Sequence, residues 1–330
     1  MPTINDIAAR LGVAKSTVSK AMNNADDISE SLRKKVLETA VEIGYEKTRN
    51  KKNSPRKLCV LVENMDYKSP SGFGHDLVLG FEQMAVPAGW QADAVMITNE
   101  LQEQTSYEVF MLSHRYEGSF ILGLSLLDPW MKDLQTAKTP AVLYDNYIQD
   151  NPFVSYVGVN NIEGFKMAVS YLKELGHTRI GYLGGDMNSF ISRERYQAYL
   201  SAMEQHGLAT DETLTGHSYF VSECTHKYLP VLLEHQVTAI LCEHDLLANS
   251  VMVHCMECGY KIPDDISIIG FDDAAFSAFT QPPLTTIRQN RNALGRCGYY
   301  ALASLLDQTF ISSLLLRAEL VVRESAGKAK

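Results

Sequence analysis

The chain has 330 residues, of which 45% are hydrophobic and 21% are charged. This length predicts more than one domain, because a single hydrophobic core stops growing well below it. The sequence has no run of about 18 uncharged apolar residues, which argues against a membrane span. Its charged first ten residues lack the apolar stretch of a secretory signal. We therefore expect a cytoplasmic protein whose six cysteines are reduced thiols.

The net charge of −9 is distributed unevenly along the chain. Residues 1–57 carry 12 Lys and Arg against 7 Asp and Glu, whereas the remainder carries 18 against 32. A basic head on an acidic body is expected when only the head meets a polyanion. Six of the positive charges lie in KTRNKKNSPRK at 47–57, a run that by itself reads equally well as a solvated linker.

The head reads as three short helices. The first is expected to begin after Thr3, with an acidic capping-box partner three residues on, and to end at Gly12. The second runs through KSTVSKAMN. The third begins after Ser29, a good N-cap, and ends at Gly44. Two short helices joined by a glycine turn form a helix-turn-helix arrangement.

The second helix has the pattern of a helix that reads DNA. Such a helix needs long polar or cationic groups outside and small apolar groups inside. Val18, Ala21 and Met22 are expected to turn inward. The side chains expected to project outward are Lys15, Ser16, Thr17, Ser19, Lys20 and Asn23. A plain three-helix bundle would show a similar amphipathic pattern, so the spacing alone leaves both interpretations open.

The body changes period from Leu58 onward. Short β-rich runs, among them LCVLVE, ADAVMI, GSFILG and AVLYD, alternate with amphipathic helical stretches. A second series contains YVGV, RIGYLGG, TGHSYF, TAILCE, ISIIGFDD and finally LTTIR. Strands that alternate with helices of this length predict parallel, doubly wound sheets. The two series predict two similar α/β lobes behind the all-α helix-turn-helix head.

The head resembles the headpiece of the LacI/GalR family of bacterial transcription regulators. The resemblance rests on T-I-x-D-I-A at the start, G-V-A-x-S-T-V-S-K-x-M-N in the second helix and R-x-x-V…G-Y at the end. In that family the first residues of the recognition helix read bases, which implies this role for Lys15, Ser16 and Lys20. The residues implied as phosphate contacts are Thr3, Thr17, Ser19, Asn23 and Ser29.

The head departs from the family pattern in two places. Lys20 stands where Arg is usual, and an ammonium lacks the bidentate fork with which a guanidinium grips guanine. Family members commonly carry a hinge helix whose Leu wedges into the minor groove. Residues 46–57 contain no Leu, form a shorter connection and include Pro55, which would interrupt a helix. We therefore expect no leucine wedge, but a basic arm in which Lys51 and Lys52 contact phosphates.

The body resembles the effector domain of the same family, which is similar to periplasmic sugar-binding proteins. The landmarks are ELGHTRIGYLGG at 174–185, RERYQAY at 193–199, PDDISIIGFDD at 263–273 and PPLTTI at 282–287. The resemblance implies two lobes that close on a ligand held between them. The expected divisions are a head at 1–46, a linker at 47–57 and an effector-binding and dimerisation domain at 58–330. Within that domain the N-lobe spans about 58–159 and 291–318, and the C-lobe about 160–288 and 319–326.

Arg195 and Asp272 match the sugar-gripping positions of the family, although a structural ion pair at the lobe edge is the alternative. Phe220 stands where an aromatic face often stacks on the sugar. His244-Asp245 replaces the usual Asn-Asp, which indicates an unusual sugar. Ordinary loop positions remain an alternative for the aromatic residues Tyr67 and Phe73. The full set of expected effector contacts is Tyr67, Phe73, Asn160, Arg195, Phe220, His244, Asp245, Asp272 and Gln289.

The other motifs in the sequence give no support for a metal, cofactor or catalytic site. His254-Cys255-Met-Glu-Cys258 contains a C-x-x-C, but no second pair lies at zinc-finger spacing, so buried structural thiols are expected. The sequence contains no H-E-x-x-H, P-loop or G-x-S-x-G. Gly72-x-Gly74 is followed by Leu77 where a dinucleotide fingerprint requires Gly. We therefore expect no catalytic constellation, no metal and no cofactor.

Together these features lead us to expect a homodimeric, sugar-responsive repressor of carbohydrate-use genes that binds double-stranded operator DNA. A dimer face is expected on the body, because a head of about 50 residues buries too little surface to hold two subunits together. The absence of a heptad-bearing tail favours a dimer over a tail-joined tetramer. The alternatives are a sugar-binding module of a transport system and a cytosolic α/β enzyme such as a dehydrogenase.

Overall fold

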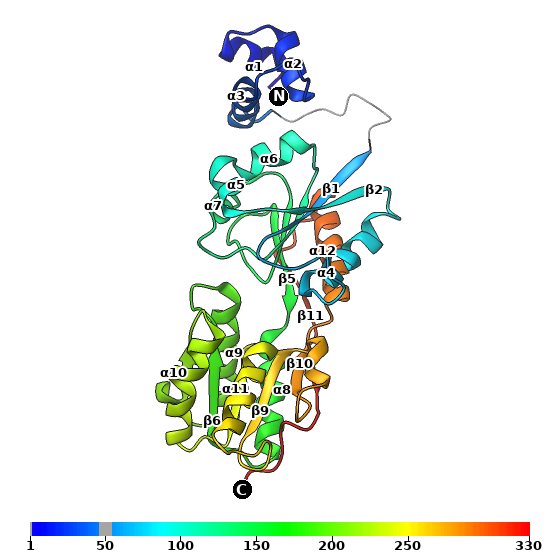
Figure 1. The fold of residues 1–330 in the computed structure, drawn as a ribbon. Coiled ribbons are helices and arrows are strands. Elements are labelled where there is room, and N and C mark those ends of the chain that lie inside the picture. Colours follow the sequence, from blue (N-terminus) through cyan, green and yellow to red (C-terminus); the bar gives the residue numbers. More distant parts are fainter. Residues whose placement is uncertain (1, 46–54) are drawn as a thin grey trace.

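The computed structural model describes residues 2–45 and 55–330. A three-helix head lies at one end of the molecule, followed by two α/β lobes stacked end to end (Figure 1). The chain begins in the head and ends in the far lobe. This arrangement confirms the predicted fold class of an all-α head and two doubly wound, largely parallel lobes.

The head is built from three helices whose ends follow local sequence signals. They are α1 (Ile4–Leu11), α2 (Lys15–Met22) and α3 (Glu30–Glu42). Thr3 and Asp6 form the expected capping box of α1. Gly12 ends α1 in the left-handed conformation with φ 65°. The fully buried core of the head consists of Ile7, Val18, Ala21, Val36 and Ala40.

The N-lobe contains a parallel sheet in the order β11-β5-β4-β3-β1-β2. Its strands are β1 (Arg56–Val62), β2 (Trp90–Met96), β3 (Ser119–Leu122), β4 (Ala141–Tyr144), β5 (Val154–Val159) and β11 (Ser313–Leu316). Its helices are α4 (Phe73–Ala85), α5 (Asn99–Gln104), α6 (Tyr107–His114), α7 (Pro129–Asp133) and α12 (Arg291–Leu306). Side chains of α4 and α12 share one core cluster with the sheet, and those of α6 and α7 share another.

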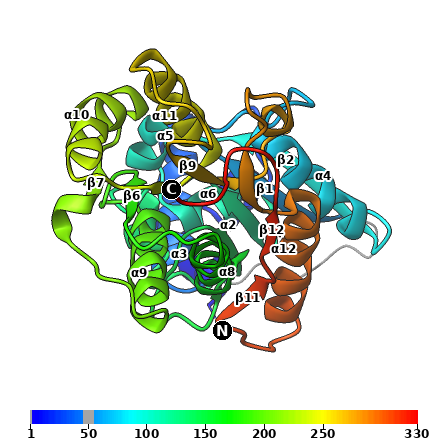
Figure 2. The same cartoon turned by 90° about the horizontal axis from the view of Figure 1, so that it is seen from below.

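The C-lobe contains a second sheet in the order β12-β10-β9-β8-β6-β7, in which only β12 runs antiparallel. Its strands are β6 (Ile180–Gly184), β7 (Thr215–His217), β8 (Ala239–Cys242), β9 (Ser267–Asp272), β10 (Thr285–Arg288) and β12 (Glu319–Val321). Its helices are α8 (Asn161–Glu174), α9 (Phe190–Gln205), α10 (Val221–Glu234) and α11 (Asp245–Glu257), with 3-10 turns η1 (Glu212–Leu214) and η2 (Ala275–Ala278). Figure 2 shows this lobe from below.

The chain passes between the lobes three times, and each passage lies beside the lobe junction. The passages join β5 to α8, β10 to α12 and β11 to β12. The sequence pattern named no element after LTTIR, so α12, β11 and β12 were missed. The two strands have only four and three residues and are partly exposed, which leaves a weak signal.

Helices α4 and α12 pack closely because each has a glycine at the contact. A Cβ atom on Gly295 would lie 2.0 Å from the Leu77 carbonyl oxygen. A Cβ atom on Gly80 would lie 2.1 Å from the Asn292 carbonyl oxygen. Any larger residue at either position would push the two backbones apart. This contact supports one face of the N-lobe sheet.

Strand β1 begins inside the expected basic linker. The Arg56 guanidinium lies 3.6 Å from the centroid of the Trp90 ring, and Lys57 lies 3.4 Å from the Asp93 carboxylate. Two of the six linker cations are therefore strand residues with partners on the lobe. Lys51 and Lys52 lie outside the described residues. Within 2–45 and 55–330, no helix has the length and apolar character needed to cross a membrane.

Candidate functional site

The amino end of α2 is the exposed tip of the head's second helix. Ala14 precedes α2 and provides no side-chain cap for its first N–H groups. The side chains of Lys15 and Ser16 are exposed at this end, and that of Lys20 is exposed in the last turn of the helix. The helix dipole places partial positive charge at the amino end, so it can receive phosphates or base-edge acceptors.

The other expected DNA contacts of the head lie at helix ends or beside them. Thr3 and Ser29 are the N-caps of α1 and α3, and both are exposed. Asn23 follows α2, and its side-chain amide donates to the Ser19 carbonyl oxygen at 2.7 Å. Thr17 and Ser19 are half-buried. The structure therefore places these polar groups on or near the surface of the head, where Thr3, Asn23 and Ser29 also hold local backbone geometry.

Lys20 has a partner that the sequence interpretation missed. Its Nζ atom forms an ion pair with the Asp27 carboxylate, and both side chains are more than half exposed. The hydrogen bond from Lys20 lowers the pKa of Asp27. The carboxylate offsets the charge of the ammonium and holds it near the turn between α2 and α3. The signal available in the sequence was the acidic pair Asp26-Asp27 beside a cationic helix.

The lobe junction is organised around Arg195 of α9, which is only 4% exposed. Its Nη1 donates to the Glu243 carbonyl oxygen at 2.6 Å, and its Nε donates to Asn161 Oδ1 at 3.3 Å. Its Nη2 lies 3.5 Å from Asp272 Oδ1, and the guanidinium lies 3.9 Å from the centroid of the Phe271 ring. Burial opposes the charge of Arg195, but nearby carboxylates, above all Asp272, raise its pKa.

Hydrogen bonds continue from Asp272 into the N-lobe. Gln289 Nε2 donates to Asp272 Oδ1 at 2.7 Å, and the Tyr144 hydroxyl donates to Gln289 Oε1 at 3.2 Å. The Phe73 ring lies 6.2 Å from the Tyr144 ring. The structure thus brings together four of the expected effector residues, Phe73, Arg195, Asp272 and Gln289. This chain of contacts joins the two lobes through side chains alone.

Asp145, which the sequence interpretation missed, adds a carboxyl group at the same junction. Its Oδ1 atom is buried and has no hydrogen-bond partner among the described residues. Burial raises the pKa of Asp145 to about 7, with Arg195 and a hydrogen bond with Tyr144 opposing the shift and the carboxylates of Asp272 and Glu194 reinforcing it. A buried acceptor without a donor is unusual, and a ligand hydroxyl can supply that donor.

Two of these carboxyl groups stand on strained backbone. Asp145 directly follows β4 and has φ 52°, and Asp272 ends β9 with φ 114°. Positive φ angles are uncommon outside glycine and cluster where function requires them. Both residues lie at the carboxyl ends of parallel strands, which is where open α/β sheets bind ligands. That position was the sequence signal for Asp145, in the run AVLYD.

Further missed residues surround this cluster. Asn161 Nδ2 donates to Glu194 Oε2 at 2.5 Å, and the Tyr156 hydroxyl donates to the same oxygen at 3.3 Å. The rings of Tyr147 and Phe190 stack 6.1 Å apart, one from each lobe. Each of these residues lies far from its partner in the sequence, so no local pattern indicated the pairing.

Asp245 is directed into the C-lobe instead of toward Arg195. Its carboxylate accepts hydrogen bonds from the hydroxyls of Thr286 at 2.5 Å and Ser277 at 2.6 Å, and from the Ala274 N–H at 2.7 Å. Burial and the nearby Asp272 raise the pKa of Asp245 to about 7. These bonds tie the segment that follows β9 to strand β10, so Asp245 supports the site without facing Arg195.

The remaining expected effector residues also have local partners. His244 caps α11 by accepting from the Leu247 N–H at 3.1 Å, and burial lowers its pKa. Asn160 caps α8 in the same way. Phe220 precedes α10 with 61% of its surface exposed, and Tyr67 packs partly buried against the N-lobe core. Among the described residues, neither Phe220 nor Tyr67 forms a hydrogen bond, ion pair or ring contact with Arg195.

The C-x-x-C pair does not form a closed site. Cys255 is buried, but Cys258 is exposed, so the expectation of two buried thiols is wrong for Cys258. Burial raises the pKa of the Cys255 thiol to about 12. In the part of the chain that the structure describes, no three His, Cys, Asp or Glu side chains gather as metal ligands.

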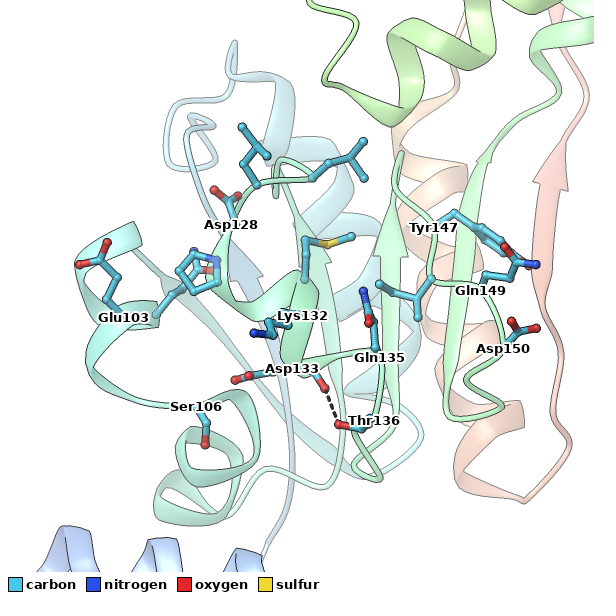
Figure 3. Close-up of a pocket in the computed structure, with 16 residues that line it drawn as sticks. Glu103, Ser106, Asp128, Lys132, Asp133, Gln135, Thr136, Tyr147, Gln149 and Asp150 are labelled. Carbon is cyan, nitrogen blue, oxygen red and sulfur yellow. Dashed lines mark hydrogen bonds between the residues drawn. The ribbon is translucent and has the colours of Figure 1, made fainter.

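A groove of about 1000 Å³ lies on the N-lobe, away from the Arg195 cluster. It runs along α7 from Glu103 and Ser106 to Tyr147 and Gln149, as Figure 3 shows. The side chains that line it are mainly polar, and none of the expected effector residues is among them. Tyr147 links one end of this groove to the lobe junction through its contact with Phe190.

Comparison with known proteins places both parts of the chain. Residues 3–47 match the model of the bacterial regulatory proteins of the lacI family, and residues 169–326 match that of a periplasmic binding protein-like domain. The HTH-type transcriptional repressor CytR of Escherichia coli (strain K12) is 30% identical, over 98% of this chain and 96% of CytR.

Solved structures agree with this placement. The complex of the transcriptional regulator CelR with cellobiose is 27% identical and has a TM-score of 0.71, covering 98% of this chain and 100% of the CelR chain. The lac repressor dimer bound to operator and the anti-inducer ONPF has a TM-score of 0.68 at 23% identity, covering 99% of each chain. At that identity the second likeness supports the fold alone.

Proposed function

Because the chain belongs to the LacI family of bacterial regulatory proteins and is a DNA-binding transcriptional regulator, we propose that it is a homodimeric repressor of carbohydrate-use genes. A sugar-like effector would bind at the lobe junction and control operator affinity. The observation that carries this proposal is the chain of contacts from Arg195 through Asp272, Gln289 and Tyr144, which joins the two lobes behind the helix-turn-helix head.

On the DNA side, Lys15, Ser16 and Lys20 would contact base edges in the major groove. Phosphate contacts from the rest of the head and from the arm would fix its register. That set is Thr3, Thr17, Ser19, Asn23, Ser29, Lys51 and Lys52. A phosphate-rich interface releases counterions, so binding should weaken steeply as the salt concentration rises. Its DNA target places the protein in the cytoplasm.

On the effector side, the junction offers the hydrogen-bonding groups that a polyol requires. The Arg195 guanidinium donates, while the carboxyl groups of Asp145 and Asp272 accept or share protons with hydroxyls. The Phe73 ring can cover an apolar face of the ligand. His244 and Asp245 would act by shaping the site, since both are engaged within the C-lobe. The cellobiose complex of CelR supports a carbohydrate as the ligand class.

We divide the body at its three passages, into an N-lobe of about 58–159 and 291–318 and a C-lobe of about 160–288 and 319–326. A ligand that contacts both sides of the junction favours one arrangement of the lobes over another. Since DNA binding and ligand binding would then bias the same element, each must alter the affinity for the other by the same factor. This is a binding mechanism, and we propose no enzymatic activity.

Dimerisation is assigned to two exposed apolar faces of the body. The face on the N-lobe, from α4, β2 and α12, carries Leu79, Val86, Met96 and Tyr300. The face on the C-lobe, from α11 and η2 with the residues that follow, carries Leu246, Val253, Met256, Phe276 and Phe279. Large exposed apolar side chains gathered on a surface mark interaction sites. We take the partner of these faces to be a second copy of this chain, because a palindromic operator needs two heads related by a two-fold axis.

The test combines DNA selection with a ligand screen. The purified full chain is incubated with a randomised duplex library, and the selected duplex is tested by gel shift across a salt series. Thermal shift against a panel of sugars identifies the effector. Arg195→Ala should leave operator affinity unchanged and abolish the ligand response, whereas an intact response removes Arg195 from the site. Failure to select any preferred duplex at any salt concentration returns the chain to the transport-module and enzyme alternatives.

A further inference from the structure

The head rests on helix α6 of the N-lobe (Figure 1). Val109 of α6 is 6% exposed, and it belongs to the hydrophobic cluster of the head instead of the lobe's own core. Leu112, one turn further along α6, packs against the same cluster. The neighbouring residues Phe110 and Met111 face the lobe core. Helix α6 is therefore apolar on both sides, which is expected only of a helix with two partners.

Three polar contacts flank this apolar seam, of which the longest runs from Asn24 Nδ2 to the Ser113 carbonyl oxygen at 3.5 Å. The Lys34 Nζ atom of α3 donates to the Gln104 carbonyl oxygen at 2.9 Å. Arg115, which ends α6 in the left-handed conformation with φ 64°, donates through Nη2 to Asn23 Oδ1 at 3.1 Å. Asn23 ends α2, so this bond ties the carboxyl end of the reading helix directly to the lobe.

We propose that the head-facing side of α6, formed by Val109, Leu112 and Arg115, is the docking surface for the chain's own head. Docking fixes the orientation of α2 relative to the N-lobe and so performs the task that a hinge helix would otherwise perform. The connecting residues 46–57 contain no Leu for a minor-groove wedge. Docking leaves Lys15, Ser16 and Lys20 exposed, so a docked head still presents its reading face.

This inference extends the proposed function by naming how the body controls the head. When the head is held by the lobe, any movement of the N-lobes in a dimer moves both recognition helices with them. The distance between half-sites is then set by the body, since two heads must enter successive major grooves together. A freely tethered head would tolerate several half-site spacings, whereas a docked head accepts one.

The first arm of the test measures docking in the full chain without DNA. Val109→Asp places a carboxylate in the apolar seam, where it cannot be solvated while the head is docked. Amide hydrogen exchange in α3 and α6 should rise by about tenfold or more, with β5 and β9 unchanged. Lys34→Ala should raise exchange in the same segments, and Lys35→Ala should not. These two exposed lysines are neighbours on α3, and only Lys34 bonds to the lobe, so neither change threatens the fold.

The second arm measures half-site spacing on the duplex that the wild-type chain selects from a random library. Inserting two base pairs between the half-sites should weaken wild-type binding by at least about tenfold, because both heads can no longer engage. The Val109→Asp chain should bind the parent duplex and lose less than about threefold on insertion.

The docking proposal would be overturned if the insertion weakened duplex binding equally in the wild-type and Val109→Asp chains. It would also be overturned if amide exchange were unchanged in both Val109→Asp and Lys34→Ala. Failure of the wild-type chain to select any duplex would instead count against the proposed function. The exchange arm decides the docking question in that case, because it needs no DNA.

Discussion

Replacing Asp145 with Asn tests the electrostatics of the lobe junction. Asn keeps the shape of the side chain and removes its ionisable group. The Asp145 carboxyl has a buried oxygen with no donor among the described residues, and burial raises its pKa to about 7 from an ordinary value of 3.8. The folded protein therefore holds this proton more tightly than the unfolded chain does, and its stability must depend on pH.

The size and sign of the effect follow from that difference. One pKa unit corresponds to about 1.4 kcal/mol, so ionising Asp145 in the folded protein costs about 4 kcal/mol. Below about pH 4 the group is protonated in both states, and the cost is absent. Between about pH 4 and 7 the Asp145 carboxyl is ionised in the unfolded chain but still protonated in the folded protein, so the wild-type protein loses stability as the pH rises. Above about pH 7 the carboxyl is ionised in both states, and no further stability is lost. The stability of Asp145→Asn relative to wild type should rise across that window and then level off.

Thermal unfolding of both chains between pH 4 and 8.5 measures this difference. For a protein of this size each kcal/mol corresponds to about 2–4 °C in Tm. Asp150→Asn is the matched control, because Asp150 lies in the same connection between β4 and β5, is exposed and also has a left-handed backbone, with φ 65° against 52°. A Tm difference for Asp145→Asn that stays constant with pH, or that Asp150→Asn reproduces, would refute the electrostatic reasoning.

Three further changes test other parts of the molecule. Lys20→Ala should cost roughly 1–3 kcal/mol in operator binding and relax preference at one base pair, as competition with all four base pairs at each position will measure. Gly295→Ala should lower the stability of the N-lobe by about 1–3 kcal/mol, because the new Cβ atom meets the Leu77 carbonyl oxygen at 2.0 Å, and a Tm equal to wild type would contradict this packing. Phe279→Asp, at a position 84% exposed, should preserve the fold while weakening the dimer by about 2 kcal/mol, which sedimentation equilibrium measures; an unchanged dimer would exclude this face.

The elements of the head were predictable because their signals are local. Thr3, Gly12 and Ser29 act within one helical turn of their own positions, and each begins or ends the helix that was expected. The strands of the body were predictable for a similar reason, since fully buried parallel strands such as β3 and β4 read as short apolar runs. Elements β11 and β12 lack this burial, and they were missed.

The lobe junction was only partly predictable, because its chemistry depends on pairings between distant segments. Arg195 and Asp272 were expected from the family pattern, but nothing local to Asn161 or Glu194 indicated a bond between them. Asp245 has the same residue type as Asp272 and a similar place after a strand. Its carboxylate turns inward because hydroxyl donors from the 3-10 turn η2 and from strand β10 meet it there.

The docking surface on α6 could not be predicted from the sequence at all. The segment YEVFMLSH of α6 has apolar residues around its circumference, so hydrophobic periodicity identifies no outer face and predicts no partner. In three dimensions the ambiguity disappears, since Phe110 and Met111 fill the lobe and Val109 fills the head. A helix that serves two cores at once cannot shift relative to one without disturbing the other, because packed interiors do not deform continuously. For that reason α6 is suited to carry a rearrangement at the lobe junction into the position of the reading helix.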